Sequence, residues 1–245
     1  MNLIGLGIVL LAALLLLAFS FIKRKSPPRW RVIPALTKLS RAVDLSVEDG
    51  TRLFVSLGRT SLLTPRGAAP LAGLGLLRRI TERTSLSDRP PVAVAGEAAL
   101  ALLAQDTLQA GYQAMGAGDL YQPTSGRVSG MTPFSAAAGA MPILRDENVS
   151  ASMLVGDFGV EAGLLAEAAE RENSFLLGAS SDISAQAVLF ASAQEPLLGE
   201  EVFSSGAYLE AGALHAASLS VQDVLRWLII LALLAGVVLK LMGLI

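Results

Sequence analysis

The chain of 245 residues contains no cysteine and a single histidine, His215. Without cysteine the protein can form no disulfide bond, no cysteine-ligated zinc or iron–sulfur site and no thiolate nucleophile. One histidine excludes metal sites built from several histidines, although a lone catalytic histidine remains possible. The sequence therefore assigns no metal ligand and no catalytic residue, and it identifies no cofactor.

Aromatic residues make up only 5% of the chain, and the formal net charge is −2. A nucleic-acid-binding surface combines a basic patch with interleaved aromatic side chains. Here the basic residues are scattered, apart from one short segment, KRKSPPRWR at residues 23–31. We therefore expect no nucleic-acid partner.

Charged residues are also scarce, at 16%, whereas 53% of the residues are hydrophobic. This composition is too apolar for an ordinary soluble domain. Residues 3–22 carry no charge over a length that spans the ~30 Å hydrocarbon core of a bilayer. A second apolar run has its polar residues near its ends rather than along one face, which disfavours the alternative of a buried amphipathic helix. We predict two transmembrane helices, 1–22 and 223–245, and the lipid bilayer as a partner.

The residues that flank these runs indicate an orientation. They are Lys23, Arg24, Lys25, Arg226, Trp227 and Lys240. A cleaved signal peptide would carry its positive charge before the apolar stretch, whereas here the basic cluster follows it. Because basic flanks tend to stay in the cytoplasm, we expect a two-pass protein of the plasma membrane with a cytoplasmic central domain.

The region between the two runs alternates short apolar strands with longer helical stretches. The expected strands are 52–58, 90–96, 127–131, 151–156 and 174–180, and the expected helices are 34–43, 70–84, 97–115, 135–144, 160–172 and 183–192. This alternation is typical of β-α-β crossovers, and strands without polar alternation are buried on both faces. We predict an α/β fold with a Rossmann-like parallel sheet covered by helices on both faces. The domain occupies 51–194, after a basic, proline-containing juxtamembrane linker at 23–50 and before a helical return segment at 195–222.

Several segments of the chain resemble a known family. They are LFVSLG, AQDTLQAGY, SAAAGAM, NVSASMLVGDFGVEA, EPLLGEEVFSSGAYL and QDVLRWLII. In these segments the chain is similar to an uncharacterised prokaryotic membrane-protein family, a domain-of-unknown-function family. The resemblance covers nearly the whole chain and implies an α/β domain between N- and C-terminal transmembrane helices. It implies no activity, ligand or catalytic residue.

Polar residues follow several of the expected strands. In a parallel α/β sheet, ligands bind beyond the carboxyl ends of the strands, where helix N-termini point. The residues placed there by the sequence are Arg59, Thr60, Glu97, Gly156, Asp157, Gly159, Ser181 and Asp182. If the strands are neighbours, these residues form one candidate ligand-binding edge.

The stretch MLVGDFGVEAGLL at 153–165 contains the most suggestive turn, and it has two interpretations. It could cradle a phosphate, but its glycine spacing departs from G-x-G-x-x-G and it lacks the end of a Walker loop. Asp157 would repel a phosphate unless a magnesium ion lay between them. The favoured interpretation is structural: the glycines allow a tight bend, and Asp157 caps the following helix.

The remaining signals favour association over catalysis. Ser181 and Asp182 lack the sequence context of a nucleophile, and a triad with His215 would have to reach the membrane flank, so a helix cap is the better interpretation. Small residues line several expected helices, and Ala232 and Gly236 form a small-xxx-small pair that could pack against the same chain or another one. We hypothesise a non-enzymatic, self-associating or scaffolding membrane protein, whose partners are a second copy or other membrane proteins. The alternative is a nucleotide or small-metabolite sensor or enzyme that uses the strand ends.

Overall fold

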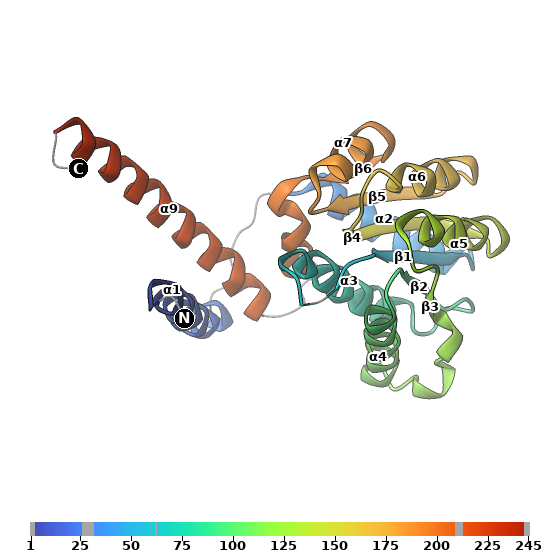
Figure 1. Cartoon of the computed structure of the whole chain (residues 1–245). Coiled ribbons are helices and arrows are strands. Elements are labelled where there is room, and N and C mark those ends of the chain that lie inside the picture. Colours follow the sequence, from blue (N-terminus) through green and yellow to red (C-terminus); the bar gives the residue numbers. More distant parts are fainter. Residues whose placement is uncertain (1–2, 26–31, 62, 209–212, 243–245) are drawn as a thin grey trace. The chain divides into compact units, whose positions relative to one another are not determined.

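The computed structural model (Figure 1) describes residues 3–25, 32–61, 63–208 and 213–242. The chain divides into two compact units. One unit is Val32–Ser205, which we call the α/β unit. The other contains the terminal helices α1 (Leu3–Lys25) and α9 (Ala213–Leu241).

Among the described residues, two helices, α1 and α9, are long and apolar enough to cross a membrane. They contact each other. The partly buried side chains of α1 recur every three or four residues, at Ala12, Leu15, Leu16 and Phe19, as expected for one helix face packed on another. Helix α9 begins at Ala213, so the helical return segment predicted before residue 223 is partly a continuation of this helix.

The α/β unit contains a six-stranded sheet in the order β3-β2-β1-β4-β5-β6. The strands are β1 (Arg52–Gly58), β2 (Val92–Ala95), β3 (Gly126–Val128), β4 (Val149–Asp157), β5 (Phe175–Ser180) and β6 (Glu195–Leu197). All neighbouring strands run parallel. This is the order of doubly wound dinucleotide-binding folds, and the winding direction reverses between β1 and β4. The predicted α/β fold with a parallel sheet is confirmed.

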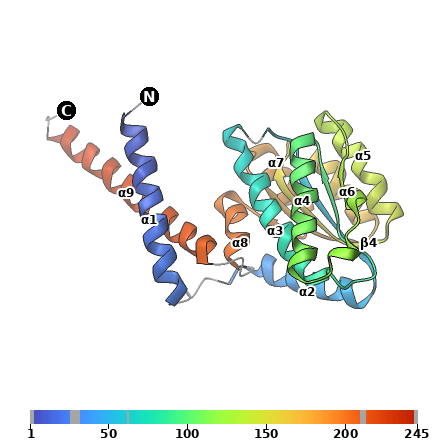
Figure 2. The ribbon, with the colours of Figure 1, turned by 90° about the horizontal axis from the view of Figure 1, so that it is seen from below.

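Helices cover both faces of the sheet (Figures 1 and 2). The α-helices of the unit are α2 (Pro34–Glu48), α3 (Ala68–Thr84), α4 (Ala98–Ala114), α5 (Pro133–Asp146), α6 (Ala162–Arg171) and α7 (Ile183–Ser192), and a short helix α8 (Ser205–Tyr208) follows. Short 3-10 turns are η1 (Pro65–Gly67), η2 (Gly118–Leu120), η3 (Pro123–Ser125) and η4 (Gly199–Ser204). Contacts place α2, α3 and α4 on one face, and α5, α6 and α7 on the other.

The central strands are buried on both sides, which explains why their sequences lack polar alternation. From Leu53 to Gly58 every residue of β1 is buried. On the α5–α7 face, Phe54 and Leu154 pack with Leu165 of α6 and Leu189 of α7 in one hydrophobic cluster. The sheet is therefore a rigid platform that fixes where each strand ends.

Two segments differ from the sequence prediction. Residues Glu195–Leu197 form the edge strand β6 instead of the start of a helical return, and an edge strand tolerates Pro196 because one side of its backbone needs no ladder partner. Helix α2 lies within the segment predicted as a juxtamembrane linker. It belongs to the α/β unit because Leu36, Leu39 and Val43 are buried against the sheet.

Candidate functional site

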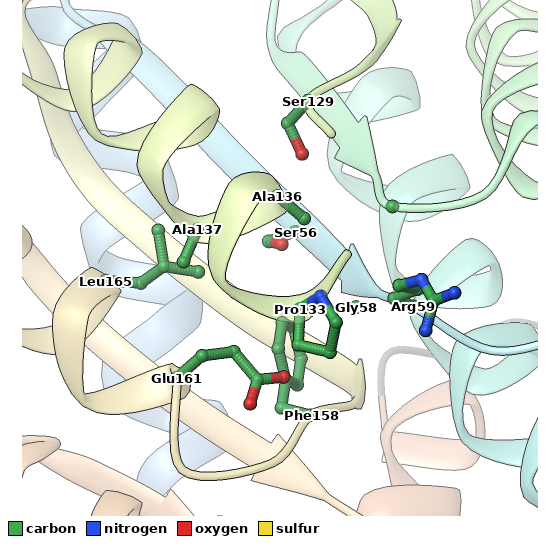
Figure 3. A pocket seen from close by; sticks show the side chains of 11 residues that line it. Ser56, Gly58, Arg59, Ser129, Pro133, Ala136, Ala137, Phe158, Glu161 and Leu165 are labelled. Atoms are coloured by element: carbon green, nitrogen blue, oxygen red, sulfur yellow. The ribbon is translucent and has the colours of Figure 1, made fainter. Parts of the chain in front are cut away.

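The carboxyl ends of β1 and β4 meet where the strand order reverses, which is the usual ligand crevice of this architecture. Figure 3 shows Pro133, Ala136 and Phe158 gathered beside Gly58 at this point. The cavity that remains has a volume of about 10 Å³. Such a volume holds roughly one water molecule. The crevice is therefore filled by the protein's own side chains.

Glycines allow the two central strands to approach closely at their ends. A Cβ atom at Gly156 would lie 2.0 Å from the carbonyl oxygen of Leu57, and one at Gly58 would lie 2.2 Å from that of Asp157. Gly58 also has a φ of +72°, which disfavours side chains. Gly156 is thus required for backbone packing, as the structural interpretation of this turn predicts.

The turn between β3 and α5, together with the start of α5, covers the crevice. A Cβ at Gly139 would lie 2.0 Å from the carbonyl oxygen of Ser129, so α5 lies directly against this turn. A capping box fixes the start of the helix, because the Ser135 amide donates to Thr132 Oγ1 at 3.2 Å and the Thr132 amide donates to Ser135 Oγ at 2.9 Å. Pro133 and Ala136 are held over the strand ends as a result.

Asp157 is the last residue of β4 and is buried, with 8% of its surface exposed. Burial raises the pKa of its carboxyl group, while the charge of Arg66 and hydrogen bonds from Thr60 and Ser181 oppose this rise. The Ser181 hydroxyl lies 3.4 Å from Asp157 Oδ1. The prediction that Asp157 caps a helix is wrong, because the turn 158–161 separates it from α6.

The other two candidate acids cap helices. Glu97 Oε2 accepts a hydrogen bond from the Leu100 amide at 3.1 Å, at the start of α4. Asp182 Oδ1 accepts from the Ser184 amide at 2.9 Å at the start of α7, which confirms the predicted cap. The hydrogen bond from the Ser184 side chain is the main cause of the lowered pKa of Asp182. Both carboxylates already have structural partners.

The structure brings part of the predicted edge together around a residue that the sequence analysis omitted. Arg66 belongs to the connection between β1 and α3, and its guanidinium group lies 3.4 Å from Asp182 Oδ2. Its positive charge also opposes the rise in the pKa of Asp157. Thr60 and Ser181 complete this group through their hydrogen bonds to Asp157. The sequence offered one signal for Arg66, because it is a basic residue in the long connection that follows the first strand.

The remaining candidates lie around this group without joining it. Arg59 is exposed at the end of β1 and has no ion-pair partner among the described residues. Gly159 donates its amide to Glu161 Oε1 at 2.8 Å. Within the described part of the chain, no three His, Asp or Glu side chains are arranged to hold a metal ion.

The residues predicted to flank the membrane are partly visible. Arg226 lies 3.5 Å from Asp223, and Trp227 is exposed on α9, as is Lys240 in its last turn. Lys23, Arg24 and Lys25 fall in the last turn of α1, and their side chains lie outside the described part of the structure. The side chain of His215 also lies outside it.

Comparison with known proteins assigns the chain to a family. Residues 2–245 match a family described as a domain of unknown function, DUF6754. The chain belongs to this family. The match extends over both apolar helices as well as the α/β unit, so the family comprises the whole arrangement and not the sheet alone. The predicted membership in a domain-of-unknown-function family is confirmed, and no curated protein and no solved structure matches the chain.

Proposed function

We propose that the chain is a two-pass membrane protein whose α/β unit works by association, with copies of itself or with other membrane proteins, and not by catalysis. The observation that carries this proposal is the filled crevice between β1 and β4, where about 10 Å³ remains for a ligand. In related architectures a nucleotide or substrate occupies this place. Here Phe158 and the start of α5 occupy it.

Orientation in the plasma membrane follows from charge. The basic segment 23–31 directly follows α1, and positive flanks favour the cytoplasmic side. The α/β unit is therefore proposed to lie in the cytoplasm. Helices α1 and α9, long and apolar enough to cross a membrane, serve as its two anchors.

Self-association is proposed to involve the second half of α9. Ala232 and Gly236 form a small-xxx-small pair, which allows membrane helices to approach closely. A Cβ atom at Gly236 would meet no atom of the described chain within 4 Å. This surface of α9 is therefore open to a second chain.

The first experiment measures the mass of the full chain in mild detergent. We expect a mass above that of one 25.5 kDa chain. Substitution Gly236→Leu should weaken self-association about tenfold or more, a change that corresponds to about 1.4 kcal/mol. Because a Cβ atom at this position meets no described atom of the same chain within 4 Å, we expect the effect to report a contact between chains.

A matched control is available in the other helix. Gly7 of α1 is equally free of neighbours within 4 Å, but leucines occupy the positions four residues before and after it. Gly7→Leu should leave the mass unchanged. A wild-type protein that is monomeric and carries no partner after gentle purification would contradict the proposed function.

The second candidate function is a nucleotide or small-metabolite sensor or enzyme. Two observations favour it: the buried Asp157 at the end of β4, and the exposed Arg59, which lacks an ion-pair partner in the described residues. Thermal unfolding with nucleotides, with and without Mg²⁺, tests it. A ligand at 100 times its dissociation constant adds about 2.7 kcal/mol of stability. We expect no shift, whereas a shift that disappears in Asp157→Asn would establish the alternative.

A further inference from the structure

Helix α7, which packs on β5 and β6 (Figure 1), contains no charged residue. Its sequence is ISAQAVLFAS, whereas each of the helices α2–α6 includes lysine, arginine, aspartate or glutamate. A helix on a sheet normally turns its apolar residues toward the sheet and its polar residues toward water. The neighbouring helix α6 does so, because its exposed residues include Glu167, Glu170 and Arg171. Helix α7 lacks such a polar side.

The side of α7 that points away from the sheet is mainly apolar. Ala185 and Leu189 are buried, and Ala187, halfway between them along the helix, lies at the centre of the opposite side. Ile183 and Phe190 lie next to Ala187, with 84% and 67% of their surfaces exposed. Large apolar side chains that are exposed together mark an interaction surface. The exposed residues of this side form what we call the α7 face: Ile183, Ser184, Ala187, Phe190 and Ala191.

An open hollow of about 580 Å³ lies at the N-terminal end of the α7 face. It is lined by Ile183, Ser184 and Ala187 of α7 and by Arg66, Ser181 and Asp182. The side chain of Arg66 is 64% exposed and lies 3.4 Å from Asp182. At the C-terminal end of the same face, the aromatic ring of Phe190 is exposed. The α7 face therefore carries a hollow at one end and a large apolar side chain at the other.

The α7 face is complementary to a second copy of itself. In an antiparallel helix pair related by a two-fold axis, a residue before the axis lies opposite a residue equally far after the axis in the other copy. With Ala187 at the axis, Ile183 of one copy lies opposite Phe190 of the other, and Ser184 lies opposite Ala191. Large apolar side chains then meet on one flank of the crossing and small ones on the other. The alanine between them allows the two helices to approach closely.

We propose that the α/β unit pairs with a second copy through antiparallel contact of the two α7 faces. Phe190 of each copy enters the hollow beside Ile183 of the other, where Arg66 contacts its ring.

The charges at the two ends of α7 fit this arrangement. Asp182 caps the N-terminus of α7, and the last turn of the helix contains no basic residue. Antiparallel pairing places Arg66 of one copy toward the C-terminal end of the partner helix, where the helix dipole favours a cation. The inference rests on the proposed self-association, and it adds a contact surface separate from the one proposed for α9.

The size of the α7 face indicates how the contact would act. A standard stable interface buries about 800 Å² on each partner. A helix of ten residues is about 15 Å long and about 10 Å wide, so one side of α7 offers less than this area. Pairing is therefore weak between free chains. Chains anchored in one bilayer have a raised effective concentration, which favours the pair.

The absence of native cysteine allows the contact to be mapped by disulfide cross-linking in the full chain. Ala187→Cys, reconstituted into phosphatidylcholine vesicles and treated with a mild oxidant, should form cross-linked dimers about fivefold or more faster than Leu102→Cys. Leu102 is the matched control, because it is 63% exposed in the middle of α4, on the other face of the sheet. A mixture of Ile183→Cys and Phe190→Cys chains should cross-link more than either variant alone, since antiparallel pairing places these positions opposite each other.

Charge substitution at the axis tests the same contact without a cross-link. Ala187→Arg should weaken pairing about tenfold or more, because two like charges then meet, and Ala187→Glu should do the same. A mixture of the two variants should restore pairing. Energy transfer between chains labelled at Leu102→Cys measures the effect, in chains that also carry Gly236→Leu so that the contact proposed for α9 does not contribute. Because Ala187 is exposed, both variants should unfold at the wild-type temperature.

The outcomes separate this inference from the proposed function. Oligomers in the mass measurement, without cross-linking at position 187, overturn the α7 contact and leave self-association in place. A monomeric chain without cross-linking at position 187 overturns both. Cross-linking of Ile183→Cys and of Phe190→Cys each to itself, but not to one another, overturns the antiparallel geometry. Capture of a different protein at position 187, in place of a second copy, also overturns the proposal.

Discussion

Substitution of Gly156 by alanine is expected to lower the free energy of unfolding of the α/β unit by about 3 kcal/mol. The new Cβ would lie 2.0 Å from the carbonyl oxygen of Leu57 and 2.4 Å from its carbonyl carbon. Both atoms belong to the backbone of β1, the strand paired to β4 along its length. Neither strand can move aside without disturbing the buried sheet. Urea denaturation in mild detergent, followed by circular dichroism, measures the loss.

Helix α3 supplies the controls for this prediction. Gly75 has open space around its Cβ position, so Gly75→Ala should stabilise the helix by about 0.5–1 kcal/mol. Gly73, two residues earlier, would place a Cβ 2.4 Å from the carbonyl oxygen of Val155, and Gly73→Ala should destabilise the unit as Gly156→Ala does. If Gly156→Ala were as stable as the wild type, the glycine would not be required for packing, and a ligand would again explain its presence.

Most of the α/β elements could be predicted from the sequence, because buried parallel strands leave a simple signal. In the sequence, such strands are continuous apolar runs that end at glycine or proline. The predicted strand 52–58 coincides with β1, and the predicted helix 183–192 coincides with α7. Both coincide because local composition and tertiary burial favour the same state.

The edge of the sheet and its closure could not be predicted in this way. Strand β6 has three residues, one of them Pro196, and only its pairing with β5 identifies it as a strand. The strand ends that form the candidate site were predicted correctly as an edge, but the sequence holds no local sign of what packs above them. Phe158 lies in the crevice because α5, the helix that precedes β4, closes over it. Filling of a cavity is a property of tertiary packing, which periodicity does not report.

Substitution of Phe158 by alanine is expected to lower the free energy of unfolding by about 3–4 kcal/mol, since loss of a buried phenylalanine ring removes its contacts and leaves a cavity. Phe158 is 5% exposed and belongs to the hydrophobic cluster that includes Leu154 and Leu165. The same urea denaturation measures the effect. The cavity of about 10 Å³ would enlarge by much of the volume of the ring, so the variant also shows whether an opened crevice can bind small molecules.

Phe134 is the matched control, because it is an aromatic residue near the same end of the sheet but is 59% exposed. Phe134→Ala should change the free energy of unfolding by no more than about 0.5 kcal/mol, as surface substitutions do. The two phenylalanines thus separate the packing that fills the crevice from the exposed surface near the same end of the sheet. Equal stability of Phe158→Ala and the wild type would mean that the crevice is open in solution, and the ligand-binding alternative would then be favoured over a scaffold.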